Sequence, residues 1–154
     1  HGHVDDRIFK HFEEVDEIWH AGDLGTLSLA DTLDAFKPLR AVYGNIDGQE
    51  LRVVHPEVQL FSAEQVKVLM IHIGGYPGRY NRKTRELIKQ HQPDLVITGH
   101  SHILKVMYDK ALNHVHMNPG AAGKQGFHKV RTLIRFAING KKIENPEVIE
   151  LGLR

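Results

Sequence analysis

The 154-residue sequence contains no cysteine. It therefore offers neither a disulfide framework nor a thiolate metal site, and a transition metal would have to be bound by imidazole, carboxylate, amide oxygen and water. Twelve histidines supply enough imidazole for such a site. A chain of this length buries roughly two-thirds of its unfolded surface, so we expect a single domain spanning residues 1–154.

The sequence also lacks a surplus of charge of one sign. The chain contains 20 Lys and Arg residues and 19 Asp and Glu residues, which gives a formal net charge of +1. Proteins that wrap a nucleic-acid duplex need a basic surface, so nucleic acid is a disfavoured partner. No apolar run approaches the about 18 residues of a membrane-spanning helix, and no secretory signal is visible. We expect a cytoplasmic protein with no membrane partner.

The apolar residues alternate between strand-like and helix-like spacing along the first two-thirds of the chain. Helices are predicted at Val4–Glu14, at Leu27–Phe36 with Ser28 as N-cap, and at Arg82–His91. Strands are predicted at Glu17–His20, Leu39–Tyr43, Val53–Val58, Phe61–Ile73 (with a hairpin break at Ser62–Gln65) and Leu95–Thr98. This β-α-β order favours parallel strands joined by crossover helices.

The pattern changes from Val106 onward. Three further strands are predicted at His114–Met117, Arg131–Ile138 and Lys142–Glu150, and Asn139-Gly140 predicts a type I′ hairpin between the last two. A parallel α/β half followed by antiparallel strands favours two sheets packed face to face, with helices outside.

Potential metal ligands follow four of the apolar runs. They are Asp23, Asn45, His72 and the pair His100 and His102 in Gly99-His100-Ser101-His102; His1 is a sixth candidate. Ligands in open α/β sheets bind at the carboxyl ends of the strands, so we expect these side chains to meet. A carboxylate can bridge two cations while imidazole and amide groups complete each shell.

This ordered series resembles the calcineurin-like metallophosphoesterases. The matching motifs are Gly22-Asp23, Gly44-Asn45-Ile46-Asp47 and Gly99-His100-Ser101-His102, and the resemblance covers nearly the whole chain. His1-Gly2-His3 resembles the second half of the family's Asp-x-His motif, with its Asp and the first strand missing from the chain as given. Size and pattern are most similar to the small YfcE-like bacterial phosphodiesterases, a branch in which a loop like Asn118-Pro119-Gly120 lies near the site.

The resemblance implies a fold, a reaction and a ligand set. The fold is an α/β four-layer α-β-β-α sandwich of two mixed sheets. The reaction is hydrolysis of a small phosphate ester, most simply a phosphodiester, by a metal-activated hydroxide at a dinuclear centre. The ligand set is His1 and His102 for the first metal, Asp23 as the bridge, and Asn45, His72 and His100 for the second. Two divalent ions are implied, with manganese favoured and iron, zinc or nickel as alternatives.

Two departures from the family pattern have consequences. Ile46 stands where many members have a histidine that assists the leaving group, which predicts weak turnover that is best on esters with acidic leaving groups. Without the motif-one Asp, the first metal is left with His1, Asp23 and His102. Asp47 is a candidate catalytic residue that orients a ligand or substrate.

Substrate contacts are assigned to Arg79, in a glycine-rich loop, and to Asn118. Several of the candidate site residues also have a purely structural interpretation. Arg79 can be a solvated loop arginine, Asp23 a helix cap, Gly44–Asp47 an ordinary turn, and His1 the remnant of a purification tag. His72, and the pair His100 and His102, can be structural histidines. His114 and His116 share one face of a strand, and hydrogen-bonded histidines are favoured there over a second metal site. His20 and His128 are assigned to surface or packing.

One rival function belongs to another class. The same fold can serve as a non-catalytic protein-interaction scaffold, as in the retromer subunit that resembles these phosphoesterases. Because a degenerate site should have lost its ligands and five candidates remain beside His1, the enzyme is favoured. A nuclease acting on short substrates is a third alternative, weakened by the balanced charge. The natural substrate and the oligomeric state are left open, with a homo-oligomer compatible with the sequence.

Overall fold

The computed structural model describes residues 1–154 and contains four helices and nine strands. The helices are α1 (Asp6–His11), α2 (Leu27–Phe36), α3 (Gln49–Val54) and α4 (Arg82–His91). The strands are β1 (Ile18–His20), β2 (Leu39–Ala41), β3 (Val58–Ala63), β4 (Val66–Ile71), β5 (Leu95–Thr98), β6 (Lys105–Asp109), β7 (His114–Asn118), β8 (Val130–Asn139) and β9 (Lys142–Leu153). None of the helices is long and apolar enough to cross a membrane.

A five-stranded sheet in the order β3-β4-β5-β7-β6 forms the first layer. Its three inner strands run parallel, and the edge strands β3 and β6 pair antiparallel. All four residues of β5 are buried because both faces of the sheet are covered. Leu69 and Val96 pack against Ile88 of α4 on one face, while Met70 and Ile97 belong to the core on the other.

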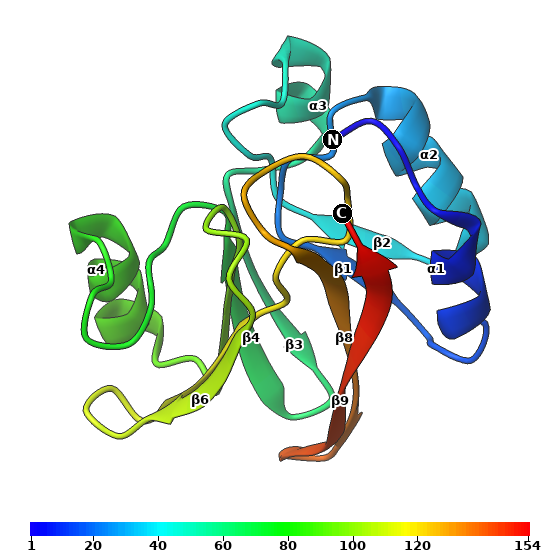
Figure 1. The fold of residues 1–154 in the computed structure, drawn as a ribbon. Helices are drawn as coiled ribbons and strands as arrows, with labels where there is room; N and C mark the ends of the chain where they lie inside the picture. The colour runs from blue at the N-terminus through cyan, green and yellow to red at the C-terminus, as the bar shows by residue number, and fades with distance from the viewer.

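The second layer consists of β1 paired in parallel with β2 and β8 paired antiparallel with β9. Helices α1 and α2 cover its outer side, so that α4 flanks one side of the molecule and α1 and α2 the other (Figure 1). In α2, Leu29, Ala30 and Leu33 are buried at the helical spacing that predicted this element. The expectation of an α/β fold is confirmed.

The second layer differs from a single mixed sheet in one respect. No strand pairs with the free edge of β1 or with the free edge of β8. Both strands line a cleft of about 740 Å³, where Trp19 of β1 and Phe136 of β8 meet edge to face with ring centroids 5.5 Å apart. Two unpaired strand edges therefore border one cleft.

Most predicted elements form within a few residues of their predicted bounds, and α4 and β5 match them fully. The strand predicted at Val53–Val58 is wrong, because residues Gln49–Val54 form α3. This helix buries Leu51 alone and leaves Val53 and Val54 exposed. The β-branched valines favoured a strand, whereas the single buried leucine and Pro56 just beyond the helix fit a short exposed helix. Strand β6 has no counterpart among the predictions.

Two local predictions are also corrected. The N-cap of α2 is Thr26, whose side chain accepts a hydrogen bond from the Leu29 amide, and not Ser28. The β8–β9 hairpin forms as predicted, but Asn139 pairs with Lys142, so the loop is Gly140-Lys141. Only Gly140, at φ 60°, has a positive φ there, which is the pattern of a type II′ turn rather than type I′.

Candidate metal centre

The polar residues that follow β1, β2, β4 and β5 meet in one place. Oδ1 of Asp23, beyond β1, lies 3.3 Å from Nε2 of His72, beyond β4. Oδ1 of Asn45, beyond β2, lies 2.9 Å from Nδ1 of His100, beyond β5. The side chains expected to converge at the carboxyl ends of the strands therefore do so.

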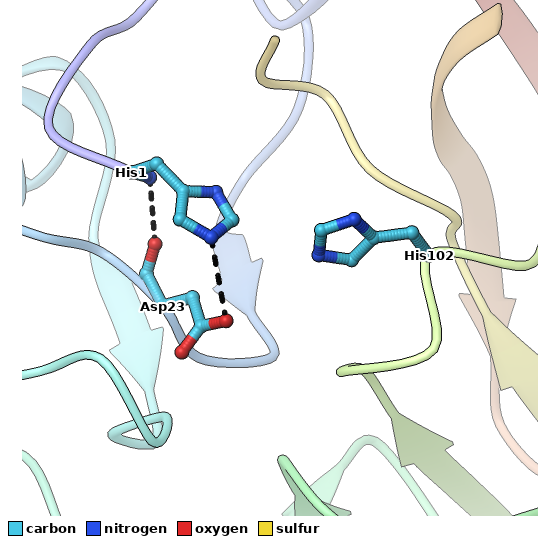
Figure 2. Close-up of side chains that lie close together, drawn as sticks. All are labelled: His1, Asp23 and His102. Carbon is cyan, nitrogen blue, oxygen red and sulfur yellow. Dashed lines mark hydrogen bonds and ion pairs between the residues drawn. The ribbon is translucent and has the colours of Figure 1, made fainter. Parts of the chain in front are cut away.

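His1, Asp23 and His102 form the first of two groups. One possible ligand atom from each residue lies within 4.8 Å of the other two. Nε2 of His1 lies 3.5 Å from Oδ2 of Asp23, and the His1 α-amino group donates to the Asp23 carbonyl at 2.7 Å. Figure 2 shows both contacts and shows the ring of His102 facing them from the opposite side. These three residues are a candidate set for one ion.

Asn45, His72 and His100 form the second group. Oδ1 of Asn45 lies 3.0 Å from Nε2 of His72 as well as 2.9 Å from Nδ1 of His100. The rings of His72 and His100 are edge to face, with centroids 5.3 Å apart. Asp23 touches both groups, since Oδ2 faces His1 and Oδ1 faces His72. Its carboxylate is thus placed where one bridging group would be needed.

The hydrogen bonding of His72 indicates that the second group lacks a cation or a proton donor at its centre. Nδ1 of His72 donates to the Ala21 carbonyl at 2.6 Å, which leaves Nε2 with a lone pair. In the neutral imidazole, that lone pair faces the oxygens of Asn45 and Asp23, so three acceptors meet without a proton to share. A cation resolves this arrangement, and a metal-binding histidine usually donates its other N–H to a backbone carbonyl. The residues therefore fit a divalent ion with nitrogen and oxygen ligands.

The electrostatics favour an ionised Asp23 and a neutral His102. Burial raises the pKa of Asp23, but His72 in its protonated form and the hydrogen bond from the Ile46 amide outweigh it, and the net pKa lies below its usual value. Burial and the neighbouring His128 lower the pKa of His102, although Asp23 opposes them. The site thus presents an ionised carboxylate and a neutral imidazole near neutral pH.

The backbone at the site is strained. Asp23 (φ 62°), His100 (φ 65°) and His102 (φ 56°) all lie in the left-handed region, which non-glycine residues rarely adopt. Such strain gathers at functional sites, where the surrounding structure holds it in place. The loops also approach closely, because a Cβ on Gly44 would overlap Oδ1 and the amide nitrogen of Asp23. Glycine at position 44 therefore lets the Asn45 loop reach Asp23.

Asp47 lies beneath the site rather than in it. It is 2% exposed, and its carboxylate accepts hydrogen bonds from the amides of Gly44 (2.7 Å), Gly25 (2.7 Å) and Leu24 (3.2 Å). It therefore ties the loop that carries Asp23 to the loop that carries Asn45. This geometry supports the orienting role expected of Asp47 and gives its carboxylate no contact with the two ligand groups.

The two predicted substrate residues differ in position. Asn118 is buried, and its amide donates to the Gly99 carbonyl (3.0 Å) and to Oγ of Ser101 (3.2 Å), while Oδ1 accepts from the Gly120 amide. It fixes the loop that carries His100 and His102. Arg79 is exposed, its side chain makes no hydrogen bond, and it lines neither of the two main pockets.

Sequence reasoning missed two histidines beside the site. His20, the last residue of β1, accepts a hydrogen bond from the Gly22 amide at 3.2 Å, and burial is the main cause that lowers its pKa to about 4. His128 lies edge to face with His102, with ring centroids 5.1 Å apart. His20 lies within a predicted strand rather than beyond its end, and no local pattern in the sequence distinguishes His20 or His128 from surface or packing histidines.

Comparison with known proteins agrees with this geometry. A probable metallophosphoesterase of Methanothermobacter thermautotrophicus is 28% identical over 151 residues, which cover 97% of this chain and 84% of that protein. Vps29 of Entamoeba histolytica complexed with Zn²⁺ has a TM-score of 0.74 at 16% identity, covering 96% of this chain and 90% of that one. A structure described as a novel archaeal phosphodiesterase has a TM-score of 0.72 at 20% identity, covering 95% and 90%. At these identities, the two structures show the fold alone.

The family is shown by a broader match. The profile of the calcineurin-like phosphoesterase superfamily domain matches residues 1–141, which include every residue of both ligand groups. Such a metallophosphoesterase needs divalent metal, in agreement with the ligand groups found around Asp23. The chain therefore belongs to the calcineurin-like phosphoesterase superfamily.

Proposed function

We propose that this metallophosphoesterase is a phosphodiesterase that hydrolyses small phosphate esters at a dinuclear metal centre. One observation carries the proposal: Nε2 of His72, Oδ1 of Asn45 and Oδ1 of Asp23 face one another as acceptors. The second oxygen of the same carboxylate faces His1, and His102 belongs to the same group of possible ligands. An arrangement of acceptors on both sides of one carboxylate favours two cations over one.

The residues have distinct parts in the proposed reaction. His1 and His102 would hold one ion and Asn45, His72 and His100 the other, with Asp23 shared. When bound, the two ions supply the Lewis-acid charge that stabilises phosphoryl oxygens and activates water. Asp47 and Asn118 hold the loops in register, so the ligand atoms lie in place before a substrate arrives. This ligand set does not choose sharply among first-row ions, and manganese is the metal that we propose and test first.

Ile46 sets a limit on the substrates. Its amide donates to Oδ1 of Asp23 at 3.2 Å, and its side chain is 46% exposed beside the site. The backbone at this position therefore supports the bridge, whereas the side chain has no proton for a leaving group. General-acid help is worth roughly 10²–10⁴-fold, so we propose that diesters with acidic leaving groups react fastest.

A non-catalytic scaffold is the second candidate function, and the likeness to Vps29 favours it. Vps29 of Entamoeba histolytica is described as complexed with Zn²⁺, so metal binding by itself does not separate an enzyme from such a protein. Hydrolysis does separate them. The presence of two ligand groups around Asp23 supports the enzyme.

The test is metal-dependent hydrolysis of bis(p-nitrophenyl) phosphate. It uses this chain and a version extended upstream of His1 by a strand ending in Asp-x, so that His1 completes the Asp-x-His motif. We expect Mn²⁺-dependent release of p-nitrophenolate, loss with a chelator, and a drop of more than about 100-fold in His72→Ala, since loss of a ligand should exceed the 10–100-fold effect of outer residues. His91→Ala, at the end of α4, is the matched control.

The rival function predicts the opposite result. If neither protein hydrolyses the diester with manganese, iron, zinc or nickel, while circular dichroism shows an intact fold, the phosphodiesterase proposal is wrong and the scaffold is favoured.

A further inference from the structure

His128 has one ring nitrogen that no protein group contacts. Nε2 of His128 lies 2.9 Å from the Gly123 carbonyl, and a carbonyl only accepts, so Nε2 carries the proton. In the neutral ring, Nδ1 therefore holds a lone pair. It is buried and has no hydrogen-bond partner. A buried acceptor without a donor costs free energy, and such groups in native structures call for an explanation.

His102 offers the matching donor. The ring nitrogen of His102 farther from its Cβ, Nε2, is drawn on the side that faces Asp23 and His1 (Figure 2). If Nε2 binds the ion, the proton of the neutral imidazole must be on Nδ1. No hydrogen bond involves His102 in the structure. The metal-binding tautomer of His102 therefore has a free N–H and needs an acceptor.

Gly126 brings the two nitrogens together. A Cβ on Gly126 would overlap Nδ1 of His102 and lie 3.2 Å from Nδ1 of His128. The φ of Gly126 is +119°, a conformation that other residues rarely adopt. The guanidinium of Arg154 donates to the Gly126 carbonyl and holds the loop from the other side. Both Nδ1 atoms thus border the same small space, which a direct hydrogen bond or one water can span.

The ring geometry agrees with this pairing. His102 and His128 are edge to face at 5.1 Å and 82°. The two histidine pairs that face the proposed ions have nearly the same arrangement, at 5.5 Å and 77° for His1 and His102, and at 5.3 Å and 75° for His72 and His100. His128 does not belong to the group of ligand atoms around Asp23. Its place is behind His102, one step away from the ion.

We propose that His128 is a positioning residue for His102: its Nδ1 accepts a hydrogen bond from Nδ1–H of His102, directly or through one water, and holds Nε2 of His102 unprotonated toward Asp23. This inference rests on the proposed metal site. It adds a chain of groups to that site, from the Gly123 carbonyl through His128 to His102. His128 makes no contact with substrate in this scheme, and its effect reaches the reaction through the orientation and tautomer of His102.

The first test reads the tautomer of His102 in the metal-free protein by long-range ¹H–¹⁵N NMR near neutral pH. We expect protonation at Nδ1 in the wild type. His128→Leu removes the acceptor, and His102 should then populate both tautomers. His128→Asn places an amide oxygen near the position of Nδ1 and should restore the wild-type spectrum. A wild-type His102 protonated at Nε2, or the same spectrum in all three proteins, would overturn the proposal.

The second test measures Mn²⁺ affinity by titration calorimetry in the same proteins, with thermal unfolding as the check on folding. Loss of the outer partner of a ligand typically costs about 10–100-fold in metal affinity, so we expect that loss in His128→Leu and recovery to within a few-fold in His128→Asn. His91→Leu should match the wild type. Equal affinity in His128→Leu and the wild type would overturn the positioning role and leave the metal site standing. If the wild type binds no divalent ion, the metal site and this inference both fall.

Discussion

Single residues decide the geometry around Asp23. Its two carboxylate oxygens face different ligand groups, 3.3 Å from His72 and 3.5 Å from His1. The loops beside Asp23 pack closely against the candidate ligands, because a Cβ on Gly44 would overlap Asp23 and a Cβ on Gly22 would overlap His72. The site therefore depends on glycines as closely as on the ligands themselves.

Gly44→Ala should remove metal binding although it replaces none of the proposed ligands. The new Cβ would overlap the Asp23 backbone and lie 2.8 Å from its Cγ, so Asp23 must move. Overpacking of this kind costs about 1–3 kcal/mol of folding free energy. Gly48→Ala is the control, because nothing lies within 4 Å of a Cβ there. Calorimetric Mn²⁺ titration should show loss of binding in the first variant only, and equal binding in both would contradict this account of Gly44.

Asp47→Asn should destabilise the fold and loosen the site together. The carboxylate accepts three amide hydrogen bonds, and an asparagine side chain turns one acceptor oxygen into a donor facing a backbone N–H. Leaving such a buried pair unsatisfied costs about 1–3 kcal/mol, to be measured by urea unfolding. Asp16→Asn, at an exposed position, should leave stability unchanged. Unfolding free energies that agree in the two variants would show that Asp47 does not brace the loops.

At the scale of elements, a buried hydrogen-bonded trio joins the loop before α4 to β7. The hydroxyl of Tyr80 lies 2.8 Å from Nε2 of His114 and 2.7 Å from Nδ1 of His116. His114 and His116 lie two residues apart in β7, so their side chains are on the same face of the strand. The expectation that they are hydrogen-bonded histidines is confirmed.

This trio should make stability depend on pH. Burial, with the charges of His114 and Lys105, lowers the pKa of His116 to about 4 against the opposing charge of Asp109. Between pH 6.5 and 4 the histidine is protonated in the unfolded chain, where its pKa is near 6.5, but stays neutral in the folded protein. The unfolding free energy should therefore fall as pH drops from 6.5 to 4. His20 has the same sign, with a pKa of about 4. Chemical denaturation from pH 4 to 7.5 measures the slope.

The matched variant for this prediction is His116→Phe, which keeps a buried ring of similar size. Its unfolding free energy should vary less with pH than that of the wild type, by up to one proton in the slope, because His20 and other groups still titrate. A variant with the full wild-type slope would exclude His116 as a source of the acid sensitivity.

For the whole molecule, the decisive feature is the cleft between β1 and β8. Each strand has one unpaired edge, and both line a cleft of about 740 Å³. Unpaired edges invite an added strand. An extended segment in this cleft would join β1–β2 and β8–β9 into one sheet, and its end would lie near the ligand groups, because β1 and β8 also line the pocket that holds His1 and His102.

Hydrogen exchange can check this prediction. Amides of β1 and β8 should exchange faster than those of the fully buried β5, because their sheets are narrow and each has an open edge. The chain extended upstream of His1 by a strand ending in Asp-x, which His1 completes to Asp-x-His, should show slower exchange in β1 and β8 and bind Mn²⁺ more tightly. Unchanged exchange in both strands would mean that the cleft does not accept a strand.

The sequence by itself determined the class of fold and predicted the candidate ligands. Gly22-Asp23, Gly44-Asn45 and Gly99-His100-Ser101-His102 each follow an apolar run, and strand ends are read from local spacing. It also predicted α4 and β5 with their exact bounds, since the apolar periodicity and the nearby Pro93 are local signals. It failed at α3, where β-branched valines outweighed the weak signal of one buried leucine.

Only the tertiary structure decided which histidines the two oxygens of Asp23 face, that Asp47 and Asn118 brace loops, and that His128 lies beside His102. These relations join residues that are distant in the chain and depend on which loop packs beside which. The split of the second layer into two sheets is of the same kind. Local periodicity records how a segment is buried, but the pairing of edges and loops is set by packing across the whole chain.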